Sequence, residues 1–226
     1  MRGYPLLVGG DLTMLFSRIK KSRNEMFDRE YEFNKITSAI NDEVPLIVVT
    51  GIRRVGKTTL VKVLLNEIDM SGIYIDARKL WSIHANISPN VIKKEIVKSF
   101  NARKSYAPVM KLLQSLKSIT IAGSGVEFKD ENTDLIDVLD DIESSGEKTV
   151  IVFDEAQYLR YSNYDYTALF ASLNDNYENI TLILTGSEIQ ILEEFLGFND
   201  KHSPLYKREH EIVHLDRFSR VRAQCI

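Results

Sequence analysis

The segment GIRRVGKT, residues 51–58, constrains the fold more than any other part of the chain. It matches the pattern G-x-x-x-x-G-K-[ST], in which the two glycines allow a tight loop whose backbone N–H groups converge on an anion. The β-branched run PLIVVT at 45–50 precedes it, and a helical apolar stripe from Leu60 to Ile68 follows it. Strand, loop and helix in this order favour a phosphate-binding loop over a glycine turn with an incidental lysine.

Each part of this loop has an expected role in binding a nucleoside triphosphate. Lys57 is predicted to reach the β- and γ-phosphates, and the Thr58 hydroxyl is predicted to ligate Mg²⁺. Thr59 is expected near the α-phosphate, and Arg53 and Arg54 are interpreted as solvated or as bracing the loop, with a partner or the γ-phosphate as the alternative contact. The predicted nucleotide-binding set is Gly51, Ile52, Arg53, Arg54, Val55, Gly56, Lys57, Thr58 and Thr59.

Five short apolar runs, including the one before the loop, predict an α/β fold. They lie at residues 45–50, 72–76, 149–154, 180–185 and 210–215. Their near-continuous hydrophobicity indicates a parallel sheet covered on both faces, and helical patterns alternate with them. We expect a three-layer sandwich of the P-loop NTPase type. The segment ITIAGSGVEFK at 119–129 predicts a small β-hairpin insertion that decorates the sheet.

An adjacent acidic pair ends the third apolar run. Asp154 is predicted to hold the Mg²⁺ shell at the carboxyl end of its strand, and Glu155 to polarise the attacking water. Such a pair is typical of hydrolytic additional-strand ATPases, for which the expected strand order is 5-1-4-3-2. Gln157 is expected to orient water or to contact the next strand. The plainer interpretation is a strand that ends in solvated acids.

The fourth apolar run ends in the polar residues Thr185, Gly186 and Ser187. A polar side chain at this place can sense a γ-phosphate, so Ser187 is predicted to do so. Ser187 is alternatively the N-cap of the following helix, with Gln190 in the capping-box position, and the two roles are compatible.

Composition excludes some classes of protein. Cys225 is the only cysteine, which excludes an internal disulfide framework and fits a reducing, cytoplasmic setting. No apolar run of 18 residues occurs, so no membrane association is expected. Charge is uneven, since 91–118 holds seven basic residues and one acidic, whereas 127–147 holds nine acidic and one basic. We interpret these stretches as solvated helix faces, with a docking face for an acidic partner or nucleic acid as the alternative.

Together these motifs resemble those of the archaeal ATPase family in the STAND branch of AAA+-like NTPases, over about 14–220. The box FDRE at 27–30 is similar to that family's opening, which packs against adenine, and this implies that Phe27 and Arg29 contact the cofactor. The segment SPLYKREHEIVHL is similar to the stretch before the family's fifth strand. It implies that Arg208 is an arginine finger, although Lys207 stands where the family usually has glycine.

The resemblance also implies an organisation: an N-terminal extension at 1–26, an ATPase domain at 27–220 and a tail at 221–226. In the family, lid and winged-helix domains follow this point, and we expect this chain to be truncated before them. DNA contact is implied by the family alone, and a protein partner or self-association is expected.

The predicted function is ATP binding with Mg²⁺-dependent hydrolysis. The expected catalytic residues are Lys57, Glu155, Ser187 and Arg208, with Thr58 and Asp154 at the metal. Two alternatives stay open: a nucleotide-binding interaction module with little or no turnover, and a small-molecule kinase. A GTPase is disfavoured, because NKIT at 34–37 precedes the loop and lacks the aspartate that would read guanine.

Overall fold

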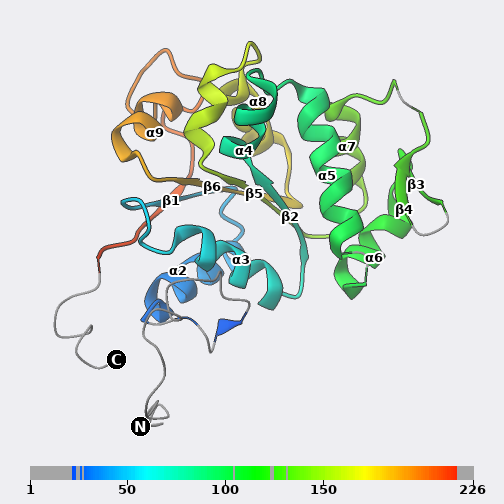
Figure 1. Cartoon of the computed structure of the whole chain (residues 1–226), viewed down its shortest axis with the longest axis horizontal. Coiled ribbons are helices and arrows are strands. Elements are labelled where there is room, and N and C mark those ends of the chain that lie inside the picture. Colours follow the sequence, from blue (N-terminus) through cyan, green and yellow to red (C-terminus); the bar gives the residue numbers. More distant parts are fainter. Residues whose placement is uncertain are drawn as a thin grey trace, which may run out of the picture.

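A five-stranded parallel sheet forms the centre of the molecule (Figure 1). The computed structural model describes residues 22–23, 26, 28–103, 105–122, 125–130 and 132–217. The strands are β1 (Leu46–Thr50), β2 (Ser71–Asp76), β5 (Thr149–Asp154), β6 (Ile180–Gly186) and β7 (Glu211–His214). They lie in the order β2-β5-β6-β1-β7, which confirms the predicted order 5-1-4-3-2 counted along the chain.

Helices cover both faces of this sheet and make the predicted three layers. They are α2 (Glu30–Asn41), α3 (Lys57–Glu67), α4 (Ala77–His84), α5 (Pro89–Arg103), α6 (Ala107–Ser115), α7 (Leu135–Ser144), the 3₁₀ helix η2 (Ala156–Tyr161), α8 (Tyr166–Asn176) and α9 (Ile189–Leu196). Side chains alternate along a strand, so β1 serves two cores. Leu46 and Val48 pack with α4 to α9, whereas Ile47 and Val49 pack with α2 and α3. Figure 1 shows α2 and α3 on the opposite side of the sheet from α4, α8 and α9.

The helix α5 closes one edge of the sheet. The hydroxyl of Ser99 accepts a hydrogen bond of 3.2 Å from the backbone N–H of Tyr74 in β2, the edge strand. Asn101 then exchanges two hydrogen bonds with the backbone of Val126. Val126 belongs to the predicted hairpin, which forms from β3 (Ile119–Ala122) and β4 (Gly125–Phe128) as a separate antiparallel pair. Residues 123–124 of its turn lie outside the described residues.

The helix α4 was not predicted from the sequence. It begins directly after β2, where the Asp76 side chain accepts a hydrogen bond of 2.9 Å from the backbone N–H of Lys79. The helix has 8 residues, of which only Ala77 and Leu80 are buried, so its sequence shows no apolar stripe. The sequence signal for this helix is the capping residue Asp76 at its start. None of the described helices combines the length and the apolar character that crossing a bilayer requires.

Candidate functional site

The phosphate loop lies between β1 and α3, as predicted. Gly51 and Gly56 have φ values of 143° and 105°, which side-chain-bearing residues rarely adopt. Gly56 is the N-cap of α3, so Lys57 and Thr58 form the first turn of that helix. The positive end of the helix dipole and its unpaired N–H groups therefore face the loop, which suits an anion.

Gly51 also permits a close approach of two chain segments. A Cβ atom at this position would lie 2.6 Å from the backbone oxygen of Leu215. We expect Gly51→Ala to lower the free energy of unfolding by about 3 kcal/mol, from backbone strain together with this clash. Gly146, with φ of 72° and open space around it, is the matched control and should lose only about 1 kcal/mol as Gly146→Ala. Denaturant unfolding measures both, and equal losses would contradict the close approach.

The Lys57 side chain folds over the loop. It is only 5% exposed, and its Nζ donates hydrogen bonds to the backbone oxygens of Gly51 at 2.6 Å and Ile52 at 2.9 Å. Burial lowers the pKa of this ammonium group, while the nearby carboxylates of Glu155 and Asp154 act to raise it. A cation is thus held between the loop and the acidic pair.

Asp154 is held by three hydroxyl groups from three elements. Its Oδ2 accepts hydrogen bonds from Thr58 at 2.8 Å and from Tyr74 at 2.6 Å, and its Oδ1 accepts one from Thr185. The carboxylate is 3% exposed. The contact between Thr58 and Asp154 brings the two predicted metal residues together.

Sequence reasoning missed Tyr74. Burial, the charge of Asp154 and the hydrogen bond to it all raise the pKa of the Tyr74 phenol, so the group stays a donor. Its sequence signal is a hydroxyl group within the second apolar run. That hydroxyl can be assigned to Asp154 only once β2 is known to pair with β5.

Glu155 adopts a left-handed backbone conformation, with φ of 55° and ψ of 48°. For a residue other than glycine this costs about 1–2 kcal/mol, and such strain is concentrated at functional sites. Its Oε2 accepts hydrogen bonds from the Ser187 hydroxyl at 2.7 Å, the Ser187 N–H at 3.2 Å and the Gln157 amide at 2.6 Å. The side chain is therefore fixed beside Asp154 with its carboxylate in one orientation.

Ser187 lies in this cluster, and the alternative role as an N-cap is wrong. The N-cap of α9 is Glu188, and no side chain caps the helix there. The Ser187 hydroxyl bonds the buried carboxylate of Glu155 instead, and Gln190 bonds Glu194 at 3.1 Å rather than closing a capping box. Glu188 forms an ion pair with Arg53, which ties this segment to the phosphate loop.

Gln157 contributes an unpaired acceptor. The residue is 2% exposed, and its Oε1 has no hydrogen-bond partner among the described residues. Its amide nitrogen is already engaged by Glu155. An acceptor of this kind beside a carboxylate suits a donor such as water.

Arg29 braces the phosphate loop from behind. Its guanidinium donates to the backbone oxygens of Val55 at 3.1 Å and Asp216 at 2.7 Å, and it pairs with Glu32 at 2.7 Å. The loop is thereby joined to the start of α2 and to the segment after β7. The implied adenine contact stays a prediction, and Phe27 lies outside the described residues.

Arg208 is not brought to the other site residues of this chain. Its guanidinium donates to both carboxylate oxygens of Asp175, at 2.7 and 2.6 Å, and these bonds lower the pKa of Asp175. Asp175 lies in the last turn of α8, before β6 begins, and Arg208 precedes β7. The pair therefore lies at the amino ends of the strands, whereas the phosphate loop follows the carboxyl end of β1. Lys207 has φ of 56°, so it keeps the left-handed conformation that a glycine would favour there.

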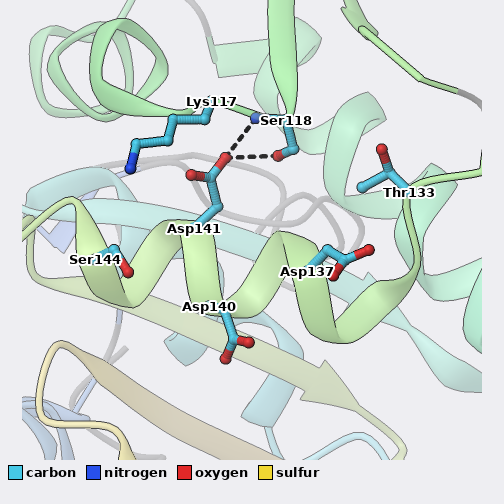
Figure 2. A pocket seen from close by; sticks show the side chains of 7 residues that line it. All are labelled: Lys117, Ser118, Thr133, Asp137, Asp140, Asp141 and Ser144. Atoms are coloured by element: carbon cyan, nitrogen blue, oxygen red, sulfur yellow. Dashed lines mark hydrogen bonds between the residues drawn. The ribbon is translucent and has the colours of Figure 1, made fainter.

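A hollow of about 390 Å³ lies away from this site and is lined by three aspartates of α7 together with Lys117, Ser118, Thr133 and Ser144 (Figure 2). Asp141 accepts hydrogen bonds from the N–H and hydroxyl of Ser118, and Asp137 accepts one from the N–H of Asp134. In the preceding basic stretch, the side chains of Lys93, Lys98, Arg103 and Lys111 likewise bond within the protein. These contacts favour a structural interpretation of the uneven charge.

Comparison with known proteins agrees with this geometry. A family described as an ATPase domain predominantly from Archaea matches residues 26–224. The structure of the Walker-type ATPase PABY2304 of Pyrococcus abyssi is similar, with a TM-score of 0.72 and 34% identity over 92% of this chain. This chain covers 59% of that protein. A structure of the Drosophila ORC bound to DNA shares the fold, with a TM-score of 0.54 and 18% identity, over 87% of this chain and 45% of that one. No curated protein gives a significant match.

Proposed function

The chain belongs to the family of ATPase domains found predominantly in Archaea, and we propose that it binds ATP with Mg²⁺ and hydrolyses it. The observation that carries the proposal is the cluster at the carboxyl edge of the sheet. There the Lys57 ammonium, the pair formed by Thr58 and Asp154, and the buried Glu155 surround the N-terminus of α3. Lys57 would supply a cation for the phosphates, Thr58 and Asp154 oxygen atoms for the metal, and Glu155 a base for the attacking water.

The donor set fits magnesium bound together with phosphate. Mg²⁺ takes oxygen ligands and usually keeps several waters, with one or two protein ligands besides the substrate phosphates. The described residues hold no group of three or more histidines, cysteines or acids that could bind a metal without phosphate. When bound, the metal would neutralise charge on the β- and γ-phosphates, with Thr58 as ligand and Asp154 in its outer shell.

Glu155 is the proposed general base. A water oxygen attacks the γ-phosphorus, the bond to the bridging oxygen breaks, and the water proton passes to Glu155, which leaves ADP and inorganic phosphate. We expect Gln157 Oε1, which has no partner among the described residues, to accept a hydrogen bond from the same water, while Ser187 holds the carboxylate. Lys57 stabilises the negative charge on the transferring group. Positioning and charge neutralisation would therefore supply most of the rate.

Two observations favour a second candidate, a nucleotide-binding module with little turnover. The Oε2 atom of Glu155 already accepts three hydrogen bonds, which leaves it poorly available to take a proton from water. Arg208, the expected arginine finger, is paired with Asp175. A partner or a further segment would then be needed to release the acid.

A hydrolysis assay on the purified chain separates these candidates. We expect release of phosphate from ATP that requires Mg²⁺ and stops with EDTA, together with tighter binding of ATP than of GTP. Binding without turnover would support the module instead, and absence of both would overturn the proposal. Equal binding of ATP and GTP would contradict the adenine role of the box at 27–30.

Tyr74 is predicted to support the metal through Asp154. Tyr74→Phe removes one of three hydroxyl donors, so the Mg²⁺ concentration for half-maximal turnover should rise about fivefold, which corresponds to about 1 kcal/mol. Tyr166→Phe is the matched control, since the Tyr166 hydroxyl donates to the Ile87 oxygen at 2.8 Å in the core. Similar Mg²⁺ curves for the two variants would exclude the metal role of Tyr74.

A further inference from the structure

Three aromatic rings form a contiguous surface between α4 and η2. Trp81 lies 5.4 Å, between ring centroids, from both Tyr158 and Tyr161, and the two tyrosine rings are 6.2 Å apart. Trp81 and Tyr161 are 37% and 47% exposed. Together with Arg160 these rings are called the aromatic surface below. It lies outside the proposed nucleotide site, and the proposed hydrolysis makes no use of it.

The charge around the aromatic surface is positive. The Arg160 guanidinium lies 4.6 Å from the centre of the Tyr161 ring, and Arg78 and Lys79 are exposed on α4. Neither α4 (ARKLWSIH) nor η2 (AQYLRY) contains an aspartate or glutamate. The nearest acids in sequence are engaged within the protein: Asp76 caps α4, Glu155 bonds Ser187 and Gln157, and Asp165 caps α8.

This combination suits one class of partner. Exposed rings give stacking platforms for bases, which all have a π-face, and nearby cations attract the phosphates between them. Arg78, Lys79 and Arg160 are exposed, whereas the nearby acids are engaged as helix caps or at the proposed nucleotide site, so the surface favours a partner that carries phosphates. We propose that the aromatic surface binds single-stranded nucleic acid.

A pocket of about 340 Å³ adjoins the surface at Arg160. It is lined also by Asn163, whose side chain can hydrogen-bond a base edge or a sugar. Asp165 lines it too, and its carboxylate is engaged by Thr167 and by the first backbone N–H groups of α8. The short helix η2 points Gln157 inward to the Glu155 carboxylate, and the Tyr158 N–H donates to the backbone oxygen of Glu155 at 3.1 Å. A strand bound here would lie one helical turn from the proposed catalytic base.

The test uses the fact that Trp81 is the only tryptophan of the chain. A single-stranded oligothymidylate of about 12 nucleotides, within the length that such sites cover, should quench its fluorescence without ATP. Fluorescence anisotropy of a labelled oligonucleotide should show that Trp81→Ala and Tyr161→Ala each weaken binding about tenfold, whereas Trp81→Phe keeps a ring and binds nearly as the wild type does. Tyr31→Ala, which removes a 76% exposed ring on α2, is the control and should change nothing.

Other outcomes would overturn the proposal. These are the absence of oligonucleotide binding, equal affinity in the two alanine variants and the wild type, and equally tight binding of a duplex, in which bases cannot stack on the rings. Light scattering distinguishes a further case: self-association that Trp81→Ala abolishes, without oligonucleotide binding, would make this face an interface between copies. Thermal unfolding of each variant checks that it is folded. Since no ATP is present, failure of this test and failure of hydrolysis are separate results.

Discussion

Replacing Glu155 by glutamine is expected to lower ATP turnover by about a hundredfold or more while nucleotide binding persists. Glutamine keeps the size of the side chain and can still bond Ser187, but it cannot take a proton from water. A positioned general base contributes about 10²- to 10⁴-fold. Phosphate release under saturating ATP and Mg²⁺ measures the loss, and titration with ADP measures binding.

The control for this variant is another acid without contact to the site. Glu194→Gln changes an exposed residue of α9 whose side chain, among the residues that the structure describes, bonds only Gln190, so turnover should not change. Unchanged turnover in Glu155→Gln would exclude Glu155 as the base. Parallel loss of binding and turnover would show instead that Glu155 maintains the shape of the site, which its contacts with Ser187 and Gln157 make a real alternative.

The predictable part of this molecule is encoded locally. The phosphate loop needs a strand, two glycines and a helix start in succession, so a single segment reveals it, and Asp154 follows because it ends an apolar run. The strand order came from the ATPase class that the motifs indicate, and the pairing of β1 with β6 and β7 confirms it.

Contacts between distant segments were the part that could not be predicted. Tyr74 reaches Asp154 only because β2 pairs with β5, and Ser187 serves Glu155 rather than its own helix because a buried carboxylate needs donors more than an exposed helix end does. For Arg208 the distant contact removed a predicted role. Its motif indicates neither the end of the sheet at which the residue lies nor its pairing with Asp175.

The phosphate loop is braced from two sides by such distant contacts. Arg29 bonds the Val55 oxygen behind the loop, and Arg53 pairs with Glu188 after β6. The loop is therefore tied both to the N-terminal box and to the segment that carries Ser187.

Replacing Lys57 by methionine is the second large effect that we expect. Loss of the ammonium removes charge-assisted hydrogen bonds to phosphate worth about 3 kcal/mol, so ATP affinity should fall roughly a hundredfold. Stability should behave differently. Burial already lowers the pKa of Lys57, and exchanging a buried cation for an apolar side chain of similar shape relieves that desolvation.

Two measurements on Lys57→Met therefore test one interpretation. Titration calorimetry should show the loss of ATP affinity, and denaturant unfolding without nucleotide should show a free energy equal to or above that of the wild type. Lys98→Met, at an exposed lysine of α5 paired with Glu95, should leave both unchanged. If Lys57→Met instead unfolds more easily, the hydrogen bonds of Lys57 to Gly51 and Ile52 are what hold the loop, and the lysine is a structural brace before it is a phosphate ligand.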